Sequence, residues 1–150
     1  MLRNGLLIAL TTAAVGGAIT GSGVAGAQAK AQMEAQLASG AIPADAAPTS
    51  PSTPEQVAVS AYLTKRGALF YGAWWCPACL AQKNLFGKEG AAQLPYVECD
   101  KTDEGRQRCV AAKIRAFPTW ELDGKRLEGV QSVEELKVWS GYPSGSTKGN

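Results

Sequence analysis

The sequence contains no histidine, and this absence limits what its cysteines can do. Two of the four cysteines, Cys76 and Cys79, form a Cys-x-x-Cys pair, whereas Cys99 and Cys109 are ten positions apart. A structural zinc site needs four ligands, commonly two such pairs or one pair with histidines. The chain offers neither set, so the pattern favours redox chemistry over metal binding. We expect no metal site and no cofactor.

The chain also lacks a strong excess of charge of either sign. Its formal net charge is +2, and acidic and basic residues are interspersed along the sequence. Proteins that bind nucleic acid usually carry a concentrated basic patch, so this distribution predicts no nucleic-acid partner. The length of 150 residues suits one domain with additional segments.

Charge is missing altogether from residues 4–29, which follow Arg3. A short apolar core lies at 6–15, small residues come next, and an Ala-x-Ala pattern ends the stretch. This order is typical of a secretory signal peptide, which we predict for residues 1–29. The alternative is an uncleaved membrane anchor at 4–26, which is long enough to span a bilayer but has a glycine-rich second half.

Export agrees with the presence of four cysteines, because disulfides persist in oxidising compartments. We therefore expect the periplasm or, in a cyanobacterium, the thylakoid lumen, with the anchor as a possible tether. Residues 30–52 are rich in alanine, proline, serine and threonine and predict a flexible linker.

Capping and turn signals divide residues 53–143 into alternating helices and strands. Thr53–Gln56 and Ser132–Glu135 form capping boxes, and Asp123-Gly124 predicts a hairpin turn. The expected helices are 53–65, 76–86, 105–113 and 132–140, and the expected strands are 68–72, 94–99, 119–122 and 126–130. This αβαβαββα order predicts an α/β, thioredoxin-like fold without its first strand, in which helices flank a central mixed sheet. Residues 144–150 are expected to be a disordered tail.

The Cys-x-x-Cys pair stands where a buried strand meets a helix. A short apolar run at 68–71 precedes it, and a helical pattern of apolar residues follows at 80–86. Cys76 is therefore expected at the first turn of a helix, where free backbone N–H groups and the helix dipole favour a thiolate. Cys79 lies one turn further on, where it can close or resolve a disulfide.

The run Phe70–Cys79 resembles the thioredoxin-like domain of the vitamin K epoxide reductase family, as do residues 96–100, 117–120 and 129–132. The resemblance covers about residues 53–143 and includes all four cysteines and Pro118. In cyanobacterial and plant members, such a domain is fused behind a quinone-reducing membrane domain. Many relatives have a histidine where this chain has Ala78, and the missing imidazole makes the pair less oxidising.

This resemblance implies the residues of the site. Pro118 would adopt the cis form, face the cysteine pair and expose neighbouring backbone to an extended substrate. Trp75, Phe117 and Thr119 would then contact substrate, and we expect Trp75 to be partly exposed. Tyr71, in contrast, is expected in the core.

Ordinary thioredoxins carry a buried aspartate six residues before the first cysteine, and Phe70 stands there in this chain. Glu98 could replace that aspartate from the next strand, but we interpret it as a surface acid.

Three alternatives remain for Cys99 and Cys109. A structural disulfide between them would close a loop worth about 3 kcal/mol on the chain-entropy model. The second alternative is a redox pair that relays electrons to or from Cys76 and Cys79, and the third is two buried free thiols. We favour the structural disulfide.

The resemblance also implies a function. The chain would be an exported protein disulfide oxidoreductase that oxidises thiols of substrate proteins and passes electrons to a vitamin K epoxide reductase-like membrane partner. One alternative is a disulfide reductase or isomerase. A Cys-x-x-Cys pair can oxidise or reduce its substrates, and its reduction potential decides which direction is favoured. Another is a non-catalytic chaperone or assembly module that uses the aromatic rim, formed by Tyr71, Trp74, Trp75 and Phe117.

Overall fold

The computed structural model describes residues 28, 31–32, 35 and 47–143. The predicted signal peptide or anchor, most of the linker and the tail at 144–150 fall almost entirely outside this part of the chain. Within the described residues, no helix combines the length and hydrophobicity needed to cross a membrane.

A four-stranded mixed sheet forms the centre of the domain, with the strand order β2-β1-β3-β4. Strand β1 (Leu69–Gly72) pairs in parallel with β2 (Tyr96–Glu98) and antiparallel with β3 (Thr119–Leu122), which pairs with β4 (Lys125–Glu128). The helices are α2 (Pro54–Lys65), α3 (Pro77–Asn84), α4 (Gly87–Ala92), α5 (Asp103–Ala111) and α6 (Val133–Ser140). The predicted α/β, thioredoxin-like fold is confirmed.

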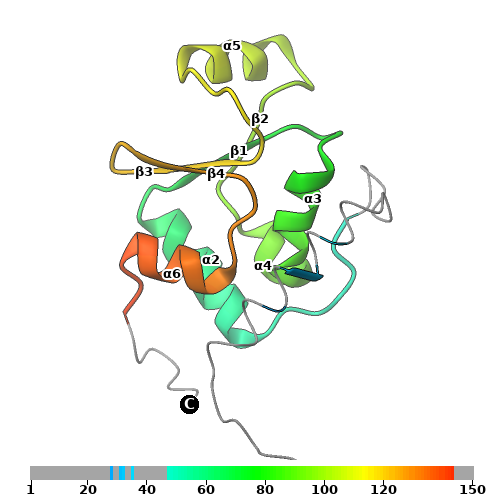
Figure 1. The fold of residues 1–150 in the computed structure, drawn as a ribbon, viewed down its shortest axis with the longest axis vertical. Coiled ribbons are helices and arrows are strands. Elements are labelled where there is room, and N and C mark those ends of the chain that lie inside the picture. The colour runs from blue at the N-terminus through cyan, green and yellow to red at the C-terminus, as the bar shows by residue number, and fades with distance from the viewer. Residues whose placement is uncertain (1–27, 29–30, 33–34, 36–46, 144–150) are drawn as a thin grey trace, which may run out of the picture.

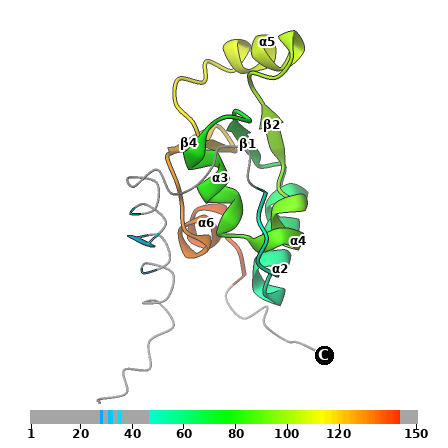
Figure 2. The same ribbon diagram turned by 90° about the vertical axis from the view of Figure 1, so that its right-hand side faces the viewer.

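The two faces of the sheet carry different parts of the core. Helices α2, α4 and α6 lie on one side of the sheet and α5 lies on the other (Figures 1 and 2). Neighbouring residues of a strand point to opposite faces. Phe70 accordingly belongs to the main core with Trp120, whereas Tyr71 packs in a separate cluster with Val97 and the Cys99–Cys109 bridge.

Local signals in the sequence set the helix starts as expected. Both predicted capping boxes form, since Thr53 and Ser132 each exchange side-chain and backbone hydrogen bonds with the residue three positions on. The hairpin between β3 and β4 turns at Asp123 and Gly124, which both have positive φ (51° and 73°).

The helix predicted at 76–86 corresponds to α3, but a second helix, α4, follows it directly and was not predicted. Gly87 has a φ of +68°, a conformation that glycine adopts without strain and that redirects the chain. Ser52 stabilises this junction: its hydroxyl donates to the carbonyl of Phe86 (2.7 Å) and accepts from the N–H of Gly90 (2.8 Å). Helix α4 then packs on α2, where Ser60 donates to the carbonyl of Gly90 (2.7 Å).

Candidate active site

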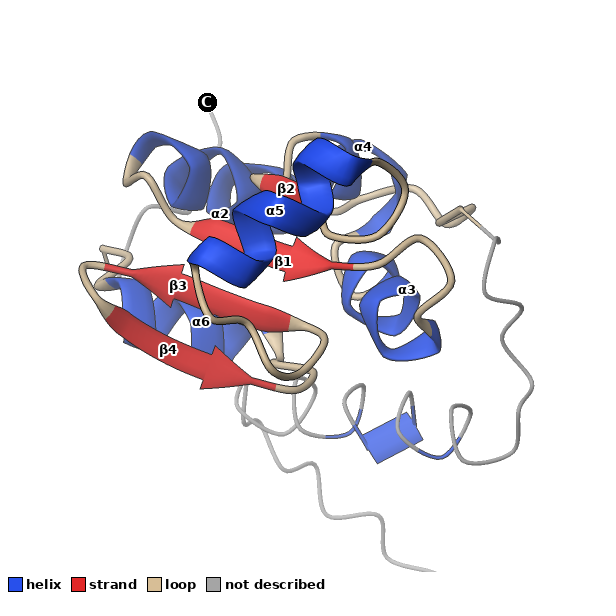
Figure 3. Cartoon of the chain, turned by 90° about the horizontal axis from the view of Figure 1, so that it is seen from above, coloured by secondary structure: helices blue, strands red, loops and turns tan. Residues whose placement is uncertain are grey.

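Cys76 occupies the N-cap of α3, just beyond the carboxyl end of β1 (Figure 3). Its backbone is extended (φ −83°, ψ 112°), and Pro77 at the first helical position has the φ that a helix requires. The sulfur of Cys76 accepts a hydrogen bond from the backbone N–H of Cys79 (3.2 Å). A thiolate at this position therefore receives the free N–H groups of the first helical turn.

Cys79 lies one turn into the helix, with its sulfur 2.7 Å from that of Cys76, to which it donates its proton. This hydrogen bond is the largest cause that lowers the pKa of Cys76 to about 7; burial opposes it, and the backbone N–H groups of Cys79 and Ala78 support it. The same bond, together with burial, raises the pKa of Cys79. When the reduced pair loses a proton, the negative charge is therefore on Cys76 and the remaining proton stays on Cys79.

Both cysteines are buried, and Cys76, at 5% exposed, is slightly more accessible than Cys79, at 1%. A groove of about 790 Å³ runs beside them. Besides the two cysteines, its lining includes apolar side chains and three lysines: Ala73, Leu80, Ala91, Leu94, Lys83, Lys88 and Lys101.

The peptide bond between Phe117 and Pro118 is cis, as predicted. Phe117 packs against the core cluster that contains Cys76 and Cys79, and its ring meets that of Trp75 edge-on at 6.3 Å. Trp75 is 44% exposed, and its indole N–H donates to Asp100 (2.6 Å). The structure therefore brings the predicted contact residues Trp75 and Phe117 together beside the pair.

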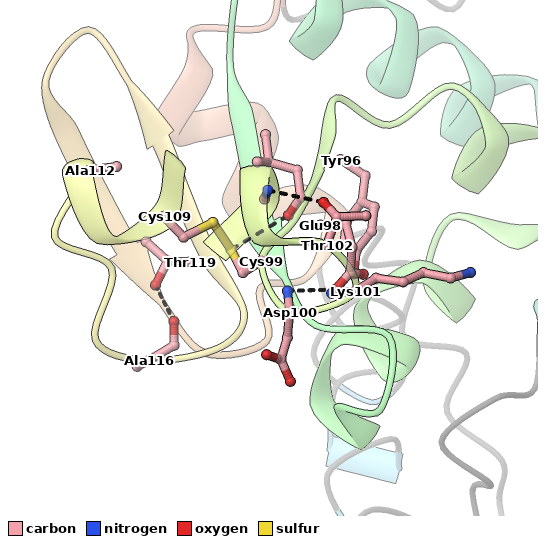
Figure 4. The surroundings of a disulfide bond; sticks show 12 residues. Tyr96, Glu98, Cys99, Asp100, Lys101, Thr102, Cys109, Ala112, Ala116 and Thr119 are labelled. Carbon is pink, nitrogen blue, oxygen red and sulfur yellow. Dashed lines mark hydrogen bonds between the residues drawn. A yellow bond between two sulfur atoms is a disulfide. The ribbon is translucent and has the colours of Figure 1, made fainter. Parts of the chain in front are cut away.

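Thr119 lies differently from these aromatic residues. Its side chain is buried, and its hydroxyl donates to the carbonyl of Ala116 in the preceding loop (2.7 Å, Figure 4). The side chain of Thr119 consequently stabilises the loop before Pro118 instead of facing the groove. Tyr71 is buried, as expected.

Cys99 and Cys109 form a disulfide with an S–S distance of 2.02 Å and a Cα–Cα distance of 5.6 Å (Figure 4). The alternative of two free thiols is therefore wrong. The bridge joins the end of β2 to α5 and is buried, packed with Tyr71 on the face of the sheet opposite Phe70.

Sequence reasoning missed a set of polar contacts beside Cys79. Glu98 is half-buried, so its interpretation as a surface acid is wrong; it accepts from the hydroxyl of Tyr96 (2.6 Å) and from backbone N–H groups of the following loop. The ammonium group of Lys83 lies 3.6 Å above the centre of the Tyr96 ring. Only the spacing of Cys79 and Lys83, four residues apart on one helix, signalled this arrangement.

Comparison with known proteins agrees with this geometry. Over 99 residues, the chain is 40% identical to a protein of Arabidopsis thaliana, the thiol-disulfide oxidoreductase LTO1. The chain is thus similar to a thiol–disulfide oxidoreductase. The matched part is 63% of this chain but 26% of the relative, so the chain spans about a quarter of that protein's length. No family model matches the chain. The similarity and the fold together support a thioredoxin-like domain.

Proposed function

We propose that the chain is an exported thiol–disulfide oxidoreductase that exchanges disulfides with substrate proteins through its Cys-Pro-Ala-Cys sequence at 76–79. The observation that carries the proposal is the cysteine pair itself. The sulfur of Cys76 sits at a helix N-cap, with its pKa lowered to about 7, and lies 2.7 Å from the buried sulfur of Cys79. Disulfide exchange requires such an attacking thiolate with a resolving thiol beside it.

The exchange proceeds in two steps, here in the oxidising direction. A substrate thiolate attacks the sulfur of Cys76 in the Cys76–Cys79 disulfide, and Cys79 leaves as a thiolate that takes up a proton. A second substrate thiolate then attacks the substrate sulfur of the mixed disulfide, and Cys76 leaves with the bonding electron pair. The substrate loses two electrons and the cysteine pair gains them.

The reduced pair then passes two electrons to a vitamin K epoxide reductase-like membrane partner. The motifs shared with that family support this partner. Export is supported by the pattern of residues 1–29 and by the Cys99–Cys109 disulfide, because such bonds persist in the periplasm and similar compartments. Pro118, Trp75 and Phe117 would contact the substrate segment, and Cys99–Cys109 would be structural.

One observation favours the reverse direction as a second candidate. A pKa of about 7 for Cys76 resembles that of thioredoxin, a reductant, more than the value of about 3.5 in the strong oxidant DsbA. A less stabilised thiolate makes the reduced pair less stable, and the pair is then a weaker oxidant. The reduction potential of the Cys76–Cys79 pair, measured by equilibration with glutathione, decides between the two directions. A potential of about −120 mV indicates an oxidant, and one of about −270 mV indicates a reductant.

The activity itself is tested by trapping. In the full chain, Cys79→Ala leaves the attacking sulfur in place but removes the resolving thiol, so mixed disulfides through Cys76 should accumulate with substrate proteins. Cys76→Ser is the matched control and should trap nothing. The partner is supported if cysteines of a vitamin K epoxide reductase-like membrane enzyme are among the trapped species. If Cys79→Ala traps no protein, the oxidoreductase proposal fails. A chaperone activity that the Cys76→Ser variant retains would then support the non-catalytic alternative.

A further inference from the structure

Resting on the proposed function, we infer that Lys83 assists the resolving step: its ammonium group, held over the ring of Tyr96, stabilises the Cys79 thiolate as it forms. The proposal concerns the step of the reducing direction in which Cys79 attacks the sulfur of Cys76 in the mixed disulfide. In the oxidising direction the same step runs in reverse, with Cys79 as the leaving thiolate.

The helix α3 places Lys83 on the same side as Cys79. The two residues are four positions apart, and side chains at this spacing are neighbours on a helix surface. Both also line the groove beside Cys76. Lys83 is the half-buried one of the three groove lysines, whereas Lys88 and Lys101 are exposed.

Tyr96 connects the ammonium group to the sulfur. A Cβ added to Gly72 would lie 2.8 Å from the sulfur of Cys79 and 2.9 Å from Cε2 of Tyr96, so the sulfur and the ring edge both flank this glycine. The ammonium group of Lys83 lies 3.6 Å from the centre of the same ring. An aromatic ring attracts a cation to its face, which fixes a long and otherwise mobile side chain near Cys79.

Glu98 holds the ring in place. Its carboxylate accepts from the hydroxyl of Tyr96 (2.6 Å) and from the backbone N–H groups of Asp100 (2.9 Å) and Lys101 (3.2 Å) (Figure 4). Burial acts to raise the pKa of Glu98, but these hydrogen bonds outweigh it and lower that pKa. Glu98 therefore stays ionised, and its negative charge also favours the ammonium form of Lys83.

The resolving thiol needs this help because its surroundings oppose ionisation. Cys79 is 1% exposed, and Phe70 occupies the core beside it, so β1 supplies no acid or base there. In the mixed disulfide, Cys76 is uncharged, and the charged groups that line the groove are then Lys83, Glu98 and the exposed lysines 88 and 101. Burial lowers the pKa of Lys83, and a negative charge on Cys79 raises it, so the thiolate and the ammonium favour each other.

The chemical step balances without another reactant. The Cys79 thiol releases its proton to solvent, and the resulting thiolate attacks the sulfur of Cys76 in the mixed disulfide. The Cys76–Cys79 bond forms, the bond from Cys76 to the substrate sulfur breaks, and the substrate leaves as a thiolate that takes up a proton. Lys83 neither gains nor loses a proton.

A two-phase reaction of the reduced full chain with dithiodipyridine separates this step from the first. Attack by Cys76 releases one thiopyridone, and attack by Cys79 on the mixed disulfide releases the second. The reagent is uncharged, so a lysine does not attract it. We compare Lys83→Met, which removes the charge, with Lys83→Arg, which keeps it, and with Lys88→Met as the matched control from the same groove.

In Lys83→Met, we expect the second phase to be about 3- to 30-fold slower at pH 7. An opposite charge close to an acid shifts its pKa by about 1 to 3 units, and the greater nucleophilicity of the less acidic thiolate recovers about half of that loss on a logarithmic scale. The pH midpoint of the second phase should rise by the same 1 to 3 units. Lys83→Arg and Lys88→Met should follow the unmodified chain, and the first phase should change much less.

Three results would overturn the inference. The first is a second phase in Lys83→Met that keeps the rate and pH midpoint of the unmodified chain. The second is a Lys83→Arg variant as slow as Lys83→Met, because the side chain would then act by its shape. The third is an equal slowing in Lys88→Met. A missing first phase in the unmodified chain would refute the proposed function, and this inference with it.

Discussion

The hydrogen bond between the two cysteines makes a quantitative prediction about Cys76. The ordinary pKa of the thiol is 9.0, and the site lowers it to about 7, with the proton of Cys79 as the largest cause. Cys79→Ala removes that donor but leaves the backbone N–H groups of residues 78 and 79. We therefore expect the pKa of Cys76 to rise by at least about one unit, which lowers the thiolate fraction at pH 7 from about one half to about one tenth.

The assay is the rate of Cys76 alkylation by iodoacetamide as a function of pH, because only the thiolate reacts. At pH 7, the rate in Cys79→Ala should be about fivefold lower than that of Cys76 in the reduced unmodified chain. Above pH 9, the difference should disappear, because Cys76 is then ionised in both proteins.

Cys79→Ser provides the control, because its hydroxyl can still donate to the sulfur of Cys76. Its pH midpoint should lie between those of the unmodified chain and Cys79→Ala. The reasoning is refuted if all three proteins titrate at one midpoint, since the sulfur–sulfur bond at 2.7 Å would then have no effect on ionisation. Faster labelling of Cys79 than of Cys76 in the unmodified chain would refute the assignment of the attacking thiol.

Two further predictions concern stability. Gln82 is fully buried, and its side-chain oxygen accepts from the indole N–H of Trp120 (3.2 Å) and the backbone N–H of Gln131 (2.7 Å). Gln82→Leu leaves both donors unpaired and should cost about 3 kcal/mol in urea unfolding, and a loss below about 1 kcal/mol would contradict it. Replacing Cys99 and Cys109 by alanine should cost about 3 kcal/mol by the same measurement while leaving the alkylation rate of Cys76 unchanged; loss of that reactivity in a folded variant would favour the relay alternative.

Signals confined to a few neighbouring residues predicted most of the fold. These signals are the capping boxes at Thr53 and Ser132, the turn at Asp123 and the glycine after α2. Each depends on residues only a few positions apart, so the helix ends and the turn that they set can be predicted from the local sequence. Helix α4 was missed because its cause is distant. Glycines usually end a helix, and hydrogen bonds from Ser52, more than thirty residues earlier, help to stabilise a new one here.

In the candidate site too, features that depend on neighbouring residues were predicted, and a contact between distant segments was not. The cysteine pair, the N-cap of Cys76 and the cis bond at Pro118 follow from short motifs. The contact of Lys83 with Tyr96 depends on the register of β1 and β2, which sets Phe70 beside Tyr96 on one face of the sheet. The residues of neither strand predict that register, so the contact between Lys83 and Tyr96 could not be predicted from the sequence.

The same register bears on the second cysteine pair. Thiol–disulfide exchange requires two sulfurs to touch, but Cys79 packs on the face of Phe70 and the Cys99–Cys109 bridge on the face of Tyr71. A relay within one molecule would therefore need the two pairs to approach each other across or around the sheet, for example by release of the edge strand β2 from β1. The bridge serves the site in another way. It joins the residue after Glu98 to α5, and so fixes the end of the strand that carries the carboxylate and ring beneath Lys83.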